Sequence, residues 1–305
     1  MLFSYVRKNG GVDSLDDSLA AVAMCTDPAV LVQLGAELEL LDRYDDAVVA
    51  FRRAVEIGSP ARRHMGYALV NAGRFDEAAS AFLEAALAGE PGAWSNLGDV
   101  RDWWLHDVAG AREAFRYAAD SGDVEGLVQL AFLDRLDGDM AKARAGMERA
   151  ATGGSAHARG VLACWDWDDS HDISLEARLR EGADHYIDAR ADLAELLCAT
   201  GRASEARDLL ERAIAAGEAE HWLPLGNIYA DEVGDQEAAE AAYRSGISEG
   251  DGWCHYNLAL LLLDRGDIAE ARGHLDAGGE AGDHKARAAL TRLDRSRPRP
   301  RASQN

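Results

Sequence analysis

The chain is poor in the residues that mark disulfide-linked, membrane-spanning or aromatic-rich proteins. Its 305 residues include four cysteines, six prolines and 7% aromatic residues. The cysteines are far apart and form no paired spacing, which predicts reduced thiols and a cytoplasmic protein. The longest apolar run, residues 258–263, is too short to span a membrane, and residues 1–6 are too short for the core of a signal peptide.

Positive charge is scarce as well. The chain has 54 acidic residues against 32 Lys and Arg, a formal net charge of −22. The last fifteen residues hold five Arg and one Asp, so the rest of the chain carries −26. Such a body repels nucleic acid and anionic membranes, so neither is predicted as a partner, and a basic or neutral protein or peptide is favoured. The same charge can also serve only to keep the protein soluble, and this alternative stays open.

Catalytic motifs are missing too. The sequence has no H-E-x-x-H, no Gly-rich phosphate loop, no G-x-S-x-G and no paired C-x-x-C, and its nine histidines are scattered. We therefore predict no enzyme activity, no metal and no cofactor. The acidic segment 165–172 fails as a calcium loop, because His171 and Ala177 stand where Gly and Glu are required. It is predicted instead to be an irregular turn between two helices, held by two tryptophans.

The main positive feature of the sequence is a repeated pattern. A Leu or Met followed by a small residue recurs eight times, at intervals of 31 to 33 residues. The anchors are Leu34-Gly35, Met65-Gly66, Leu97-Gly98, Leu130-Ala131, Leu162-Ala163, Leu193-Ala194, Leu225-Gly226 and Leu258-Ala259. A second apolar step begins 13 or 14 residues after each anchor. This spacing predicts two short amphipathic helices per repeat, which bury their apolar faces by stacking on neighbouring repeats.

Two repeats carry a recognisable motif, Trp94-x2-Leu97-Gly98 and Trp222-x2-Leu225-Gly226-x2-Tyr229. With these motifs, residues 28–283 resemble tetratricopeptide (TPR) repeats. The shorter period and an Ala-x3-Gly ending are similar in part to Sel1-like repeats. The resemblance implies an all-α, right-handed superhelical solenoid of about eight helix-turn-helix repeats with capping helices at both ends.

The resemblance to TPR repeats divides the chain into four predicted segments. Residues 1–27 are predicted to form an N-terminal segment with a capping helix from Asp13 to Met24, and residues 28–283 the eight repeats. Residues 284–296 are predicted to form a C-terminal capping helix, because a solenoid must cover its open ends with polar surface. Residues 297–305 are predicted to be a disordered tail of Arg and Pro.

The resemblance also implies a binding site. In TPR proteins the first helix of each repeat lines a concave groove, with residues beside the anchor pointing inward. Most of the residues named here hold those positions, and all are expected on the groove face: Gln33, His64, Tyr67, Asn96, Asp99, Trp103, Gln129, Asp192, Glu195, Asn227 and Asn257. Amides suit a peptide backbone because they donate and accept, and carboxylates with aromatic anchors suit a basic segment. No Lys or Arg stands where a clamp for a terminal carboxylate needs one.

The predicted function is therefore a non-catalytic protein-interaction module or scaffold that binds a basic or neutral peptide segment in the concave groove. Two alternatives remain: an acidic mimic that sequesters a DNA-binding protein through its outer face, and a sensor of a peptide signal.

The third to fifth repeats have Arg101, Asp134 and Asp166 where a bulky apolar residue is expected. This shift predicts a locally rotated helix and a candidate site there. Partner identity and oligomeric state are left open.

Overall fold

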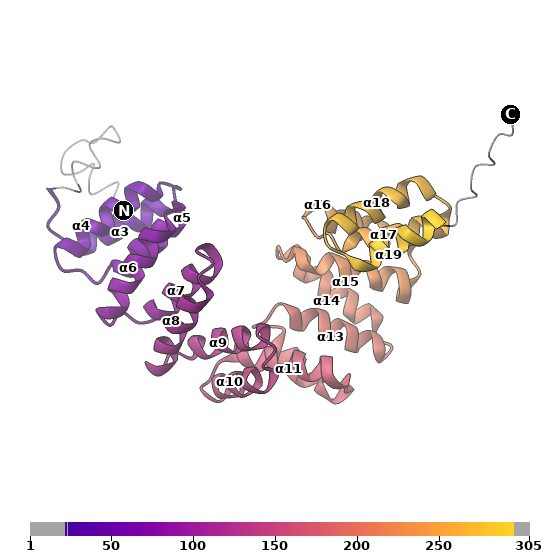
Figure 1. Cartoon of the computed structure of the whole chain (residues 1–305), viewed down its shortest axis with the longest axis horizontal. Coiled ribbons are helices and arrows are strands. Elements are labelled where there is room, and N and C mark those ends of the chain that lie inside the picture. The colour runs from indigo at the N-terminus through magenta and orange to yellow at the C-terminus, as the bar shows by residue number, and fades with distance from the viewer. Residues whose placement is uncertain (1–21, 23, 296–305) are drawn as a thin grey trace. The chain divides into compact units, whose positions relative to one another are not determined.

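The computed structural model describes Val22 and residues 24–295, and this part of the chain contains helices and no strand. The chain forms two compact units, Met1–Ala158 and Arg159–Asn305 (Figure 1). Most of the predicted N-terminal capping helix and the predicted tail at 297–305 lie outside the described residues.

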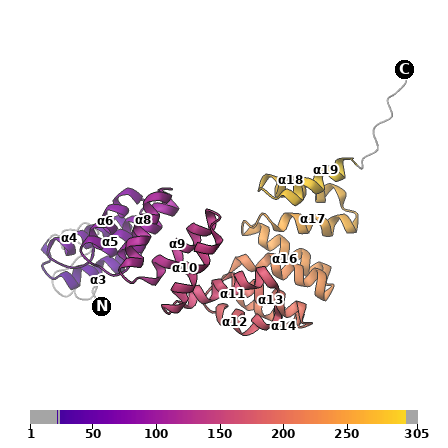
Figure 2. The ribbon, with the colours of Figure 1, turned by 60° about the horizontal axis from the view of Figure 1, so that its bottom comes forward.

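The first unit consists of helical hairpins. In it, each helix packs on the next one along the chain (Figures 1 and 2). Its elements are α3 (Pro28–Glu39), α4 (Tyr44–Glu56), α5 (Arg62–Asn71), α6 (Phe75–Leu87), α7 (Ala93–Asp99), the π-helical η1 (Val100–Trp104), α8 (Val108–Asp120), α9 (Val124–Leu136) and α10 (Met140–Thr152). The first helices of its repeats are α3, α5, α7 and α9.

The second unit repeats this arrangement. The helix α11 (Ala156–Ser170) contains the boundary between the units. It is followed by η2 (Ile173–Leu175), α12 (Glu176–Gly182), α13 (Asp188–Ala199), α14 (Ala203–Ala215), η3 (Ala219–His221), α15 (Trp222–Asn227), the π-helical η4 (Ile228–Val233), α16 (Gln236–Ser248), α17 (Cys254–Arg265), α18 (Ile268–Glu280) and α19 (His284–Arg295). The prediction of an all-α helical-repeat solenoid is confirmed.

Within a repeat, the small residue after the anchor makes room for one large side chain of the second helix. At Gly66, an added Cβ would lie 2.5 Å from Cε1 of Phe82, whose ring is buried. The same contact recurs for Gly35 with Phe51, Gly98 with Phe115 and Gly226 with Tyr243. No side chain fits between such a backbone and ring, so glycine is required wherever the partner is aromatic.

The other four repeats combine Ala with a smaller partner. Their residues after the anchor are Ala131, Ala163, Ala194 and Ala259, and the matching residues of the second helix are Met147, Leu179, Leu210 and Leu275. All eight of these side chains are buried. In all eight repeats, therefore, the residue after the anchor and the facing residue of the second helix are matched in size: glycine with an aromatic ring, and alanine with Leu or Met.

The turns inside the repeats end the first helix with a left-handed residue. Gly73, at φ 72°, donates its N–H to the carbonyl of Val70, and the N–H of Arg74 reaches the carbonyl of Leu69. These two bonds satisfy carbonyls that the end of α5 would leave unpaired.

The fifth repeat differs from the prediction. Trp165 to Ser170 are helical and belong to α11, and only His171 and Asp172 lie in the turn before η2. Trp165 and Trp167 are buried in the fold, so the expectation of an irregular turn across all of 165–172 was wrong. Trp165 and Trp167 extend the apolar face of α11 by another turn, and the burial of their large rings stabilises this part of the helix.

We predict that Gly66→Ala destabilises the protein by about 2 kcal/mol, because the new methyl group must displace the Phe82 ring. Phe82→Leu removes that clash, so the double variant should lose less stability than the two single changes added together. Urea unfolding followed by circular dichroism measures all three. Gly273→Ala is the control, since nothing lies within 4 Å of its added Cβ. Strict additivity of the two changes would contradict the proposed contact.

Candidate functional site

The structure places the predicted site residues on first helices of the repeats or directly after them. In the first unit they lie on α3 (Gln33), α5 (His64, Tyr67), α7 (Asn96, Asp99), η1 (Trp103) and α9 (Gln129). In the second unit they lie on α13 (Asp192, Glu195), α15 (Asn227) and α17 (Asn257).

The residues nearest the start of the chain make local contacts. Gln33 is exposed and donates from Nε2 to Glu37 Oε1 on its own helix, at 3.1 Å. The ring of His64 lies 5.7 Å from that of Phe51. Neither arrangement points to a specific ligand.

Two π-helical segments shape the face of the first helices. The third and seventh repeats have 14 residues between the anchor and the second apolar step, where the other six have 13. The extra residue is taken up by a wider turn, η1 in the third repeat and η4 in the seventh. After each segment comes a left-handed residue, His106 or Gly234, and then an Asp that caps the next helix. Such π-turns are frequent at functional sites.

The first π-segment borders a cavity of about 450 Å³, which we call the tryptophan hollow; it is lined by Asp99, Trp103, Trp104 and Gln129. Trp104 stacks on Phe75, with ring centroids 5.7 Å apart and planes 18° apart. Trp103 is 69% exposed and has no ring partner within the described residues. The hollow therefore presents one fixed aromatic ring and one open ring.

Polar groups continue this face on both sides of the hollow. Asn96, one helical turn before Asp99, donates from Nδ2 to the hydroxyl of Tyr67 at 2.7 Å. Its Oδ1 is buried and has no hydrogen-bond partner among the residues that the structure describes. Gln129 donates from Nε2 to Glu125 Oε1 at 2.9 Å. The site thus retains an acceptor at Asn96 that a donor group of a ligand would satisfy.

Asp99 carries an unusual charge environment. Burial first, and then the neighbouring charges of Glu125, Asp102 and Asp123, together raise its pKa to about 6. Arg101 does not relieve this, because its guanidinium donates to the carbonyl of Gly110 at 3.0 Å and lies near Asp107 at the start of α8. A cation placed at Asp99 would favour the ionised carboxylate.

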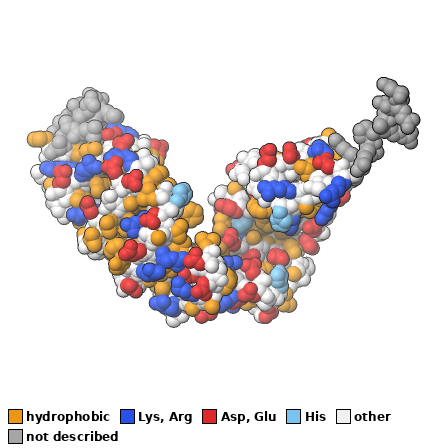
Figure 3. Space-filling model, viewed as in Figure 1, with side chains coloured by type: hydrophobic (Ala, Val, Ile, Leu, Met, Phe, Trp, Pro, Cys, Tyr) orange, Lys and Arg blue, Asp and Glu red, His pale blue; other side chains and the backbone are white. Residues whose placement is uncertain are grey.

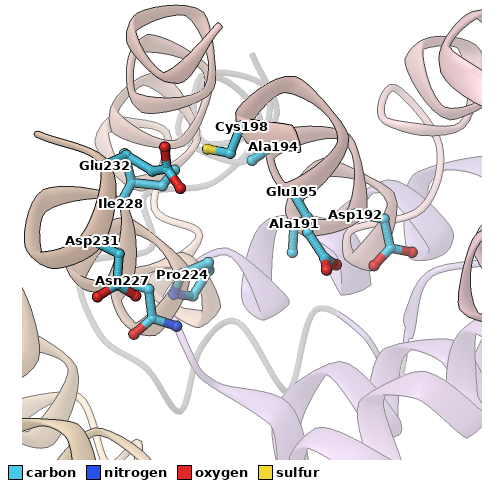
Figure 4. A pocket seen from close by; sticks show the side chains of 10 residues that line it. All are labelled: Ala191, Asp192, Ala194, Glu195, Cys198, Pro224, Asn227, Ile228, Asp231 and Glu232. Carbon is cyan, nitrogen blue, oxygen red and sulfur yellow. The ribbon is translucent and has the colours of Figure 1, made fainter. Parts of the chain in front are cut away.

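The second π-segment borders a cavity of about 260 Å³, which we call the acidic hollow (Figure 4). Asp192 and Glu195 stand on α13, while Asn227, Asp231 and Glu232 stand on α15 and η4. The remaining lining is apolar or small: Ala191, Ala194, Cys198, Pro224 and Ile228. Four carboxylates around so small a space favour a cationic guest.

Asp192 resembles Asp99 in its electrostatics. Its pKa is raised to about 6, mainly by burial. A hydrogen bond from the Cys164 thiol lowers it, and the charges of Asp168, Glu195 and Asp188 contribute to raising it. Glu195 is held differently, since its Oε2 accepts a hydrogen bond from Trp167 Nε1 at 3.1 Å.

The amides of the second unit are already engaged. Asn227 Oδ1 accepts from the Tyr243 hydroxyl at 2.9 Å and from Asn257 Nδ2 at 2.7 Å. These bonds join α15, α16 and α17, so this pair has a structural role in the unliganded fold. What Asn227 still offers a ligand is its own N–H groups.

Sequence reasoning missed Trp104, Cys198, Ile228, Asp231 and Glu232 as lining residues. For Trp104, Asp231 and Glu232 the signal was the 14-residue spacing, because an added residue in a helix turns the following side chains to new positions. Cys198 lies on α13, in a repeat of ordinary spacing, and no such signal marks it. Of the three shifted positions in repeats three to five, only Arg101 lies in a π-segment. Asp134 is buried between Arg112, at 2.5 Å, and Lys142, at 2.7 Å, which is a structural arrangement.

Two further observations concern metal binding and membrane-spanning helices. Within the described ranges, no group of three or more His, Cys, Asp or Glu side chains is placed to hold a metal ion. No helix in those ranges has the length and apolar character needed to cross a membrane.

Comparison with solved structures identifies the class of fold. The chain is similar to c5321, a protective antigen of uropathogenic Escherichia coli with an SLR fold, at a TM-score of 0.55 and 22% identity over 91% of this chain and 66% of that one. It is similar to a Sel1 repeat protein from Oxalobacter formigenes at 0.56 and 20%, over 95% and 93%. It is also similar to a chain of the APC/C hetero-tetramer Cut9–Hcn1 at 0.61 and 16%, over 92% and 59%.

These likenesses establish a helical-repeat fold of the TPR and Sel1 type, which confirms the resemblance predicted from the sequence. The chain spans less than two thirds of the first and third of these proteins. No family model and no curated protein matches the sequence. At such identities the likeness concerns the fold, and function has to be argued from the site.

We predict that Asp99→Asn stabilises the protein by about 1 kcal/mol at pH 7.5, a value reduced from the full pKa shift because the site is partly open to solvent. The folded-state pKa is raised, so protonated Asp99 favours folding at low pH and this contribution is lost as the pH rises through about 6. The gain from the substitution should therefore vanish near pH 4. Urea melts at both pH values test this, with the exposed Glu113→Gln as control. An equal effect at both pH values would refute it.

Proposed function

We propose that the protein is a non-catalytic interaction module that binds a basic or neutral protein segment along its first helices. The observation that carries the proposal is that each unit holds a half-buried carboxylate without a cationic partner in the described structure, Asp99 in the tryptophan hollow and Asp192 in the acidic hollow. Burying a carboxylate away from a counter-charge costs stability. A bound cation offsets that cost.

Carboxylates that have arginine partners behave differently. Glu176 is engaged by Arg202 and Arg180, at 2.7 and 2.8 Å, and these bonds lower its pKa to about 2. Glu240 is likewise paired with Arg244 and Arg265. On the face shown in Figure 3, acidic and basic side chains are interspersed over both units. Glu176 and Glu240 lie on second helices, α12 and α16, and their neutralisation by arginines favours binding at the first helices over an acidic mimic that acts through its outer face.

Two further observations support a protein partner. The unpaired Oδ1 of Asn96 suits a backbone N–H, and exposed Trp103 suits a side chain of the ligand. The Cut9–Hcn1 structure is a hetero-tetramer, so a protein of this fold is found there in an assembly. All four cysteines are free thiols, which fits a reducing compartment, and we place the protein in the cytoplasm.

Selection from a random peptide library tests the proposal. We expect the intact chain to enrich peptides containing Lys and Arg, and the double variant Asp99→Asn, Asp192→Asn to lose most of this enrichment. The control is Glu113→Gln, Glu280→Gln, which removes the same charge from exposed positions on α8 and α18. Equal enrichment by the double variant would move binding to the outer face and favour the acidic mimic.

The pH dependence of binding gives a second test. A cationic ligand requires ionised Asp99 and Asp192, whose pKa values are both about 6. The affinity of a selected peptide should therefore fall by about tenfold or more between pH 7.5 and pH 5. Isothermal titration calorimetry in buffers of different ionisation enthalpy should also detect proton release on binding near pH 6. An affinity that is independent of pH over this range would argue against both carboxylates as ligands.

A further inference from the structure

We infer that the tryptophan hollow is a subsite for one lysine or arginine side chain, with its cation held between the open ring of Trp103 and the carboxylate of Asp99. The inference rests on the proposed function and specifies which residue of a bound segment this part of the face recognises.

The aromatic wall is the first support. Trp103 is 69% exposed although tryptophan is among the most apolar side chains, and it has no ring partner in the part of the chain that is described. The face of an indole ring attracts cations more strongly than any other aromatic side chain. Trp104 is held by its stack on Phe75, so the wall of the hollow is fixed before a ligand arrives.

Charge complementarity is the second support, and it selects the occupant. Asp99 lines the same hollow, with the carboxylates of Asp102 and Glu125 close enough to raise its pKa. An acidic side chain is repelled here, and a neutral apolar one would leave Asp99 buried without a counter-charge. A lysine or arginine side chain suits both parts of the hollow. Its methylene stem packs on the tryptophans, and its charged group reaches the carboxylate of Asp99.

The second unit provides an internal contrast. Counted from the anchors Leu97 and Leu225, the positions of Trp103 and Trp104 in η1 are those of Asp231 and Glu232 in η4. The acidic hollow has no aromatic residue in its lining. At these two positions, therefore, the π-segment presents rings in one unit and carboxylates in the other. Of the two hollows, the tryptophan hollow is the one that combines an aromatic face with a carboxylate.

The test is nuclear magnetic resonance of the full chain labelled with ¹⁵N at tryptophan, titrated with three probes: the Nα-acetyl amides of lysine, arginine and norleucine. We expect the lysine and arginine probes to shift the indole signal of Trp103 in a saturable way, and the norleucine probe to bind about tenfold more weakly. Trp103→Leu assigns the signal. Asp99→Asn, which should remain folded, is expected to bring lysine binding down to the norleucine level.

A matched control is Trp253→Leu, which removes an exposed tryptophan of the second unit and should leave the Trp103 response unchanged. Equal binding of norleucine and lysine would show an apolar subsite and overturn the inference, as would a lysine response that survives Asp99→Asn or the absence of a saturable shift at Trp103. Failure here is distinct from failure of the proposed function. If Trp103→Leu still enriches Lys and Arg peptides from the library, the module binds basic segments at other positions.

Discussion

The close contact between a small residue of the first helix and a large side chain of the second is the constraint on which every repeat depends. A two-helix unit of about 32 residues cannot bury its own apolar faces, so the contact inside the unit must be tight enough to give its neighbours a fixed surface. Gly66 against Phe82 shows the limit, because not even a methyl group fits between them. Where alanine replaces the glycine, as at Ala194, the partner shrinks to Leu210. In both solutions the residue after the anchor and its partner on the second helix are matched in size.

Much of the fold could be read from the sequence for the same reason. The anchors mark the tight contacts, and a pattern repeated eight times averages out local deviations that mislead a single helix prediction. The deviations themselves were harder to place. An added residue can lengthen a turn as easily as a helix, and only the structure shows that in the third and seventh repeats it widens the end of the first helix. The course of Trp165 to Ser170 was misjudged because a run of acidic residues suits a turn as well as an exposed helix face.

The candidate site was less predictable than the fold. Position relative to the anchor places a residue on a helix face, but the partner that a side chain finds there depends on the next repeat. Among the described residues Asn96 Oδ1 has no hydrogen-bond partner, whereas Oδ1 of Asn227, which was grouped with it as a groove amide, accepts from both Tyr243 and Asn257. Asp134 and Asp99 are both acidic residues of first helices, yet one is enclosed by two cations and the other by further carboxylates. Such differences arise from long-range neighbours, which a single sequence does not reveal.

The matching π-segments carry a consequence for the history of the chain. Both follow a Trp-x2-Leu-Gly motif, both are followed by a left-handed residue and a capping Asp, and they lie four repeats apart. A tandem duplication of a four-repeat block that already contained the extra residue accounts for all of these features at once. Under that history the two π-segments are diverged copies of one segment, in which the same two positions became tryptophans in one copy and carboxylates in the other. The hollows beside them lie on different sides of the segment, against α9 in the first unit and against α13 in the second.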